Sequence, residues 1–124
     1  MLKAVLFDFN GVIINDEPIH NHLLEQLLIE ENLRPRPGEF QELCLGRSDR
    51  ICLRDLLERR GRTVTDAYLN DLIARKARTY VQALQALEKL PIYSGIEDLI
   101  FKLPNCKFAI VSGALRSEIE AVLD

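Results

Sequence analysis

Two short apolar segments that each end in a polar residue constrain the fold of this 124-residue chain most strongly. The first, Leu2–Phe7, ends at Asp8, and the second, Lys107–Val111, ends at Ser112. Apolar residues run almost without interruption in both segments, a pattern typical of parallel strands that are covered on both faces. We therefore expect two neighbouring parallel strands of an α/β fold.

The chain between these segments has helical periodicity for about eighty residues. Apolar residues recur at spacings of three and four, and proline, glycine and hydroxyl-bearing residues mark the helix ends. Without this helical insertion the order is strand, helix, strand, helix, which predicts a right-handed β-α-β unit. The predicted helices cover residues 18–31, a short segment around Phe40 and Leu43, Ser48 or Asp49 to Gly61, Thr65 or Asp66 to Lys89, residues 94–103 after a capping box that begins at Ser94, and residues 115–123.

Polar residues at the carboxyl ends of both strands indicate a ligand site, because open α/β sheets bind ligands outside these ends. Asp8 is followed by Phe9, Asn10 and Gly11. A carboxylate fixed at a strand end can attack a phosphoryl group and form an aspartyl-phosphate, and a divalent cation such as Mg²⁺ then offsets the repulsion between the two anions. The Asn10-Gly11 pair between apolar segments also predicts a β-hairpin, and both interpretations remain open.

The second strand leads into Ser112, Gly113 and Ala114, just before a predicted helix. A hydroxyl and free backbone N–H groups at a helix N-terminus can bind an anion. Taken by itself, Ser112 is better explained as a simple N-cap, and the pairing with Asp8 across adjacent strands is what favours a site. His20 and His22 lie near the start of the first helix on different faces, so we do not expect them to share a metal ion. His20 could face the mouth of the site, and we expect His22 at the surface.

Composition excludes several classes of protein. The chain has 48% hydrophobic and 28% charged residues, which is typical of an ordinary soluble domain. Its net charge of −3 gives no basic footprint for nucleic acid, and no apolar stretch is long enough to span a membrane. Because the start has no signal-peptide pattern, we expect a cytoplasmic protein. Three cysteines without paired spacing, Cys44, Cys52 and Cys106, predict buried thiols rather than a disulfide or a metal site.

Several of these residues occur in the order of a known motif set. Asp8-Phe9-Asn10-Gly11-Val12 and Asn15-Asp16-Glu17-Pro18-Ile19-His20 resemble the opening motifs of the haloacid dehalogenase (HAD) superfamily, in its β-phosphoglucomutase-like phosphatase branch. Gly46-Arg47-Ser48 is similar to a turn in the helical cap of that branch. Tyr93-Ser94-Gly95-Ile96 is similar to the return into its core, and Val111-Ser112-Gly113-Ala114 to its phosphate-binding second motif. The resemblance covers the whole chain in order.

The resemblance implies a division into two domains. Residues 1–16 and 93–124 would form a partial Rossmann-like core of the α/β class, and residues 17–92 an inserted helical-bundle cap domain. In the family, further strands follow with a catalytic lysine and acidic metal ligands, so we expect this chain to be a fragment or to obtain the missing strands from another chain. Self-association through exposed sheet edges is one way to do so.

The resemblance also implies a set of site residues. Asp8 would be the nucleophile and a ligand of Mg²⁺, and the backbone carbonyl of Asn10 would be a second ligand. The partner would be a small phosphorylated metabolite such as a sugar phosphate, with neither nucleic acid nor membrane involved. The residues that would bind its phosphate or other groups are Ser112, Gly113, Ala114, Gly46, Arg47 and His20.

Asn10 is the main departure from the family pattern. The family has an aspartate there, which protonates the leaving alcohol, and an amide cannot do so. General acid–base catalysis is worth about 10²–10⁴-fold, so we expect slow turnover of phosphate monoesters. Two functions stay open: a HAD-type phosphatase or phosphomutase with weak activity, and a catalytically silent HAD-like domain that binds a ligand or a protein.

Overall fold

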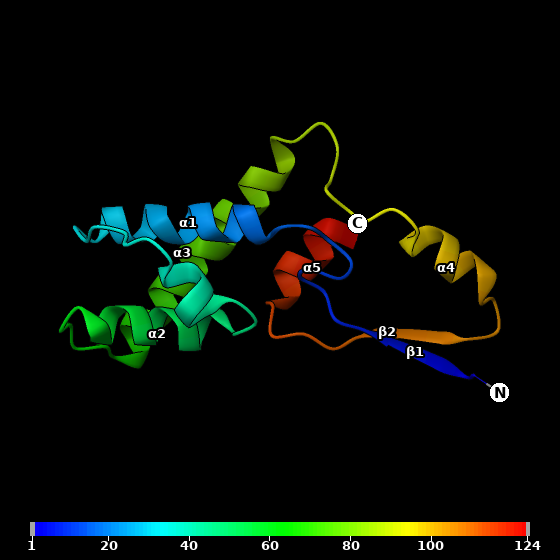
Figure 1. The fold of residues 1–124 in the computed structure, drawn as a ribbon, viewed down its shortest axis with the longest axis horizontal. Coiled ribbons are helices and arrows are strands. Elements are labelled where there is room, and N and C mark those ends of the chain that lie inside the picture. The colour runs from blue at the N-terminus through cyan, green and yellow to red at the C-terminus, as the bar shows by residue number, and fades with distance from the viewer. Residues whose placement is uncertain (1, 124) are drawn as a thin grey trace.

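The computed structural model describes residues 2–123, and within this range it contains two strands and six helices (Figure 1). A group of helices lies at one end of the molecule and the small sheet at the other, with α5 between them. In chain order the elements are β1 (Ala4–Phe7), α1 (Glu17–Glu30), the π-helix η1 (Phe40–Cys44), α2 (Asp49–Arg59), α3 (Asp66–Gln85), α4 (Ile96–Lys102), β2 (Lys107–Ile110) and α5 (Arg116–Leu123).

The two strands pair in parallel, as the sequence predicts. The register runs from Ala4 opposite Lys107 to Phe7 opposite Ile110. The Val111 N–H donates to the Phe7 carbonyl at 2.8 Å and continues the pairing by one residue. The residues that follow, Asp8 and Ser112, therefore leave the sheet side by side at its carboxyl edge.

Only one face of this sheet is covered by the described residues. Phe7 is buried in a cluster with Val122 of α5. Leu6 on β1 and Val111 after β2 are 67% and 63% exposed. Successive side chains of a strand point to opposite faces, so a single helix layer can cover only one set. The prediction that both faces are covered is thus wrong for residues 2–123.

Two hydrophobic clusters hold the helices together. The first lies among α1, η1, α2 and α3, and the second joins β1 and the turn after it to α1, α3 and α5. Helix α3 contributes to both, because Leu69 and Leu72 belong to the first cluster while Tyr80 and Leu84 belong to the second. This helix therefore connects the helical group to the sheet. The division at residues 17 and 93 remains a prediction.

The Asn10-Gly11 pair does not form the β-hairpin that it could predict. Gly11 has a φ of +80° and begins a turn in which the N–H groups of Val12 and Ile13 both donate to the Phe9 carbonyl. Ile14, completely buried, instead forms an isolated antiparallel bridge with Ile92. Ile13 and Ile14 are buried within the second hydrophobic cluster, and this burial outweighs the local preference for a hairpin.

Helix ends agree with the sequence in part. Ser48 and Thr65 accept N-capping hydrogen bonds at the starts of α2 and α3, as predicted. The predicted capping box at Ser94 is wrong, because Gly95 precedes α4 with a φ of +95° and no side chain caps the helix. Glycine adopts this left-handed conformation without the steric cost that a Cβ would bring.

The prediction of three buried thiols is also wrong. Cys44 and Cys52 form a disulfide across the loop between η1 and α2, with Cα atoms 4.6 Å apart. Only Cys106 remains a free thiol, and it is half-buried. None of the helices between residues 2 and 123 is long and apolar enough to cross a membrane.

Candidate functional site

A pocket of about 270 Å³ lies at the carboxyl ends of β1 and β2. Its wall includes residues from the sheet, from α1 and α5, and from the loop between η1 and α2. The site residues that the sequence predicts all line it: Asp8, Asn10, His20, Gly46, Arg47, Ser112, Gly113 and Ala114. The fold thus gathers residues that are up to about a hundred positions apart along the chain, while their chemical roles remain predictions.

Asp8 presents its carboxylate at the end of β1. The side chain is exposed, and the Phe9 N–H donates to its Oδ1 at 2.7 Å. This bond holds one carboxylate oxygen, which leaves Oδ2 to face solvent or a ligand. Glu17 lies beside the turn that follows Asp8, because its Oε1 would lie 3.1 Å from a Cβ placed on Gly11. A side chain at Gly11 would meet that crowding and the positive φ together.

Ser112 stands on the neighbouring strand end. The Ala114 N–H donates to its Oγ at 3.0 Å, which fixes the hydroxyl at the turn that leads to α5. Next to it, Gly113 approaches the loop of the helical group, since a Cβ on Gly113 would lie 3.7 Å from the Cα of Ser48. The Ser112 turn and the Gly46-Arg47-Ser48 loop therefore form facing parts of the pocket wall.

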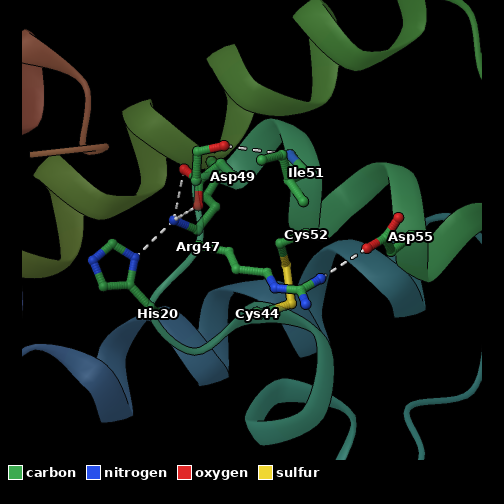
Figure 2. The surroundings of a disulfide bond; sticks show 9 residues. His20, Cys44, Arg47, Asp49, Ile51, Cys52 and Asp55 are labelled. Carbon is green, nitrogen blue, oxygen red and sulfur yellow. Dashed lines mark hydrogen bonds and ion pairs between the residues drawn. A yellow bond between two sulfur atoms is a disulfide. The ribbon is translucent and has the colours of Figure 1, made fainter.

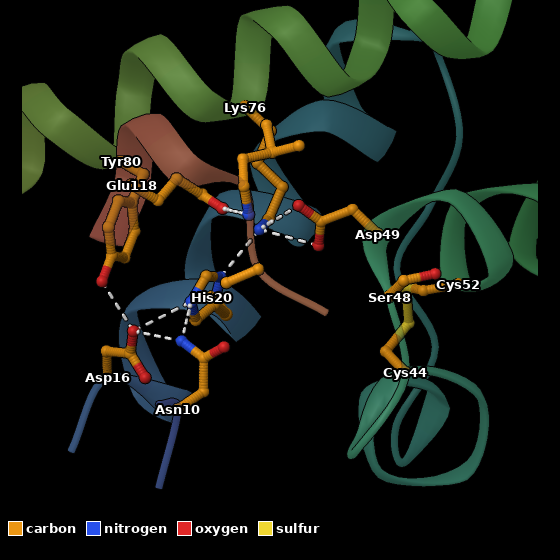
Figure 3. Close-up of polar contacts among 12 residues, drawn as sticks. Asn10, Asp16, His20, Cys44, Ser48, Asp49, Cys52, Lys76, Tyr80 and Glu118 are labelled. Carbon is orange, nitrogen blue, oxygen red and sulfur yellow. Dashed lines mark hydrogen bonds and ion pairs between the residues drawn. A yellow bond between two sulfur atoms is a disulfide. The ribbon is translucent and has the colours of Figure 1, made fainter. Parts of the chain in front are cut away.

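Asn10 does not project freely into the pocket, because its amide is part of a buried network (Figure 3). Its Nδ2 donates to Oδ2 of Asp16 at 2.7 Å. The Tyr80 hydroxyl donates to the same oxygen at 2.7 Å, and His20 Nε2 lies 3.0 Å from it. Three donors from the first turn, α1 and α3 thus converge on one carboxylate oxygen. Oδ1 of Asp16 has no hydrogen-bond partner among residues 2–123.

Lys76 continues the network toward the helical group. Its ammonium donates to both carboxylate oxygens of Asp49, at 2.9 and 3.0 Å, and to His20 Nδ1 at 2.7 Å. Because His20 Nδ1 accepts this bond, the ring hydrogen lies on Nε2 and is donated to Asp16. The network therefore fixes the tautomer of His20 and links Asn10 to Asp49 through alternating donors and acceptors.

The network also sets the protonation of its acids. Burial raises the pKa of Asp16, but hydrogen bonds from His20, Tyr80 and Asn10 outweigh it, and the net pKa lies below the ordinary value. Burial and the adjacent Asp16 carboxylate raise the pKa of Tyr80. Asp16 is thus an anion at neutral pH, and Tyr80 keeps its proton and remains a donor.

Glu118 on α5 is a second buried acid at this pocket. Its side chain is almost completely buried, and its Oε1 accepts from the Leu115 N–H at 3.2 Å. Burial raises the pKa of Glu118, while the nearby Lys76 ammonium lowers it and the Asp49 carboxylate raises it. The Glu118 carboxyl lies at the contact between α5 and α3. It is therefore close to the charges of Lys76 on α3 and of Asp49 on α2.

The sequence patterns predict no place in the site for four of the residues near the pocket: Lys76, Asp49, Glu118 and Glu17. Lys76 carried a usable signal, because it occupies a position on the apolar stripe of α3, three residues after Ile73 and four before Tyr80. A lysine at such a position is either paired or functional, since isolated buried charges are costly. His22, by contrast, is exposed as predicted.

A magnesium site at this pocket stays a prediction, with the Asp8 carboxylate and the Asn10 backbone carbonyl as the expected ligands. Both residues line the pocket. Among residues 2–123, no group of three or more His, Cys, Asp or Glu side chains is arranged to hold a metal ion. Mg²⁺ is often bound through one or two carboxylates together with water and substrate phosphate. The donors present fit an ion of this kind, held jointly with a phosphate ligand.

Comparison with known proteins identifies the class to which this fold and pocket belong. Residues 2–124 match the family of haloacid dehalogenase-like hydrolases, and the chain belongs to that family. The family resemblance predicted from the sequence is therefore confirmed, together with its α/β fold class.

Solved structures of other proteins have the same fold. CbbY from Rhodobacter sphaeroides, as an Asp-to-Asn variant in complex with xylulose-1,5-bisphosphate, matches with a TM-score of 0.82 at 19% identity. A HAD hydrolase of family IA, variant 3, from Entamoeba histolytica matches with 0.81 at 22% identity, and CbbY in complex with phosphate with 0.80 at 20%. Each match covers 98% of this chain but only 54–56% of the other. The chain thus spans little more than half the length of these proteins.

Proposed function

We propose that this chain carries the nucleophile and substrate-binding half of a phosphatase or phosphomutase-type hydrolase that acts on a small phosphorylated metabolite. The observation that carries the proposal is that Asp8 and Ser112 leave adjacent strand ends and line one pocket together with Arg47. An aspartate, a hydroxyl and a guanidinium around one cavity supply a nucleophile and two groups that suit phosphate oxygens.

In the proposed reaction, Asp8 attacks the phosphorus atom of a phosphate monoester. Its Oδ1 is held by the Phe9 N–H, so Oδ2 is the oxygen that forms the bond. The Ser112 hydroxyl and the N–H groups of the following turn hold the phosphoryl oxygens, and the alcohol leaves with a proton taken from solvent. Mg²⁺, bound by Asp8 and the Asn10 carbonyl, would offset the repulsion between the carboxylate and the phosphate.

Asn10 is the reason that turnover is slow in this proposal. An amide cannot give a proton to the leaving alcohol, and here its Nδ2 is already engaged with Asp16. Loss of a general acid costs about 10²–10⁴-fold in rate. Esters with good leaving groups need less protonation, so an aryl phosphate should react faster than a sugar phosphate.

Sugar phosphates are the substrate class that we favour. CbbY, whose fold this chain has, is known in complex with xylulose-1,5-bisphosphate and with phosphate. The pocket here is large enough for a small polar ligand and has polar side chains from several elements around it. We further propose that residues 17–92 act as the cap domain and residues 1–16 and 93–124 as the core, so that the pocket lies where the two meet.

The second candidate function is a catalytically silent domain that binds a phosphorylated ligand or a protein. One observation favours this function: the Asn10 amide donates to Asp16, which also accepts from Tyr80. The residue at the position of the family's general acid therefore stabilises the buried network rather than transferring a proton. Under this alternative the pocket would bind phosphate without cleaving esters.

Turnover of an aryl phosphate in the presence of Mg²⁺ separates the two functions. We expect slow release of phosphate by the unaltered chain, and none by the Asp8→Asn variant. This variant keeps the size of the side chain and one oxygen that can accept a hydrogen bond, but it lacks the nucleophilic carboxylate. Inorganic phosphate should still bind to both proteins in a calorimetric titration. Binding without any turnover in the unaltered chain would favour the silent domain, and equal turnover by both proteins would contradict Asp8 as the nucleophile.

A further inference from the structure

We propose that the Cys44–Cys52 disulfide is a redox-responsive clasp that positions the loop between η1 and α2 for substrate binding. The inference rests on the proposed function in one respect, because it takes this loop to contact the phosphorylated ligand. Figure 2 shows the disulfide beside the Arg47 side chain.

The bond closes the loop at its base. Cys44 is the last residue of η1, and Cys52 lies in the first turn of α2. Both are almost completely buried, and both line the pocket. Between them, residues 45–49 also line the pocket throughout. The disulfide therefore forms the floor of the pocket directly below the segment that carries Arg47.

Few other interactions hold the middle of this loop. The Arg47 N–H donates to the Cys44 carbonyl at 3.0 Å, and Gly46 takes a φ of +75° in the turn. Ser48 Oγ is 3.5 Å from the Ile51 N–H that it caps, which is a long hydrogen bond. The Arg47 guanidinium pairs with Asp55 at 3.1 Å, but the two side chains are 47% and 37% exposed, and such surface pairs contribute little.

The far end of the loop is fixed differently. Asp49 is held by the buried ammonium of Lys76 on α3, and Gly113 packs against Ser48. With the disulfide intact, residues 45–48 are thus tethered at both ends. With it broken, the end at Cys44 keeps the packing of η1 in the first hydrophobic cluster but loses its covalent link to α2.

Reduction would change the packing beneath the loop. A dithiol reductant transfers two electrons and two protons to the disulfide: the S–S bond breaks, two thiols form, and the dithiol closes to a cyclic disulfide. Two thiols need van der Waals separation, so Cys44 must move away from Cys52 in a close-packed interior. The segment attached to Cys44 carries Gly46 and Arg47, so the displacement reaches the pocket wall.

The position of the bond adds a reciprocal effect. Cys44 and Cys52 both line the pocket, and Cys44 also borders a second cavity of about 20 Å³, so a bound phosphate ligand would obstruct the wider approach of a reductant. If oxidation tightens phosphate binding, phosphate must equally stabilise the oxidised state. The structure thus couples the redox state of two cysteines to occupancy of one site.

Hydrogen exchange on the unaltered chain tests the clasp by itself. After reduction by dithiothreitol under native conditions, we expect faster exchange of the amides of residues 45–48 and unchanged exchange in the centre of α3. The Cys106→Ser variant, whose disulfide is intact, should respond in the same way. A variant with Cys44→Ser and Cys52→Ser should exchange fast at this loop with or without reductant. Equal exchange at the loop before and after reduction would overturn the clasp.

Calorimetric titration with inorganic phosphate tests the coupling. We expect reduction to weaken binding about five- to tenfold, the lower range of typical coupling between sites, and phosphate to slow the rate of reduction. The double serine variant should bind weakly in either condition. Equal affinity before and after reduction would overturn the coupling. If the oxidised chain binds no phosphate, the proposed function fails and the exchange measurement still decides whether the clasp exists.

Discussion

Replacing Asn10 with Asp would put a second carboxyl group beside Asp16. The Asn10 Nδ2 atom lies 2.7 Å from Asp16 Oδ2, so one oxygen of the new side chain would take nearly that position. Two ionised carboxylates at this separation repel by about 6 kcal/mol at an effective dielectric constant of about 20. One pKa unit corresponds to about 1.36 kcal/mol, so keeping a proton on a carboxyl with the ordinary pKa of about 3.9 costs about 4 kcal/mol at pH 7, which is less than the repulsion.

The new carboxyl should therefore stay protonated at neutral pH and donate to Asp16. Asp16 already accepts from His20 and Tyr80, which stabilise its negative charge, so the proton belongs on the new side chain. A protonated carboxyl at the pocket is a general acid. Hydrolysis of an alkyl phosphate monoester should rise by about 10²–10⁴-fold, with a much smaller gain for an aryl phosphate.

Two measurements check this prediction. Phosphate release from both ester types gives the ratio of alkyl to aryl hydrolysis for the unaltered chain and the Asn10→Asp variant. Carbon-13 NMR of the new carboxyl, in metal-free buffer, gives its pKa. Adding Asp16→Asn removes the repulsion and should lower that pKa toward the ordinary value of about 3.9. An unchanged ratio of rates, or a pKa at the ordinary value in the single variant, would refute the reasoning.

The buried network supports two further predictions. Tyr80→Phe removes one of three donors to the Asp16 carboxylate and should cost about 1.5–3 kcal/mol of unfolding free energy in chemical denaturation at neutral pH. The pKa of Asp16 lies below its ordinary 3.8, so the stability that its ionised form contributes is lost as pH falls through that lowered value. The difference in unfolding free energy between the unaltered chain and Tyr80→Phe should therefore shrink below about pH 4. Lys76→Met leaves Asp49 without its buried partner and should lower the unfolding free energy by about 3 kcal/mol. Adding Asp49→Asn should recover part of this loss, and a loss that the second change leaves unaltered would contradict the pairing.

The sheet and most helices could be predicted because their signals are local. An apolar segment that ends at Asp8 or Ser112 specifies a strand and its carboxyl end, and Ser48 and Thr65 cap helices through bonds to residues three positions on. These features depend on few neighbours, so the sequence pattern carries them. Parallel pairing then follows from the β-α-β order, and it brings the predicted site residues to one pocket.

The features that escaped prediction depend on contacts between distant segments. Tyr80 meets Asp16 across 64 positions of the chain, and Lys76 meets Asp49 across 27. The disulfide joins cysteines only eight positions apart, but it needs the reversal of direction between η1 and α2, which the spacing does not reveal. The missing hairpin after Asn10 has the same cause, since burial of Ile14 against other segments overrides the local turn signal.

Trapping a phosphoryl group on the protein tests most directly the central claim, that Asp8 is the nucleophile of a slow phosphotransfer site. With Asn10 in place of the acid, we expect the phosphorylated form to persist long enough for mass spectrometry after brief incubation with acetyl phosphate and Mg²⁺. The account predicts one added phosphoryl group, sensitive to hydroxylamine, on the peptide that contains Asp8, and none on the Asp8→Asn variant. A phosphoryl group on another residue, or equal labelling of both proteins, would contradict it.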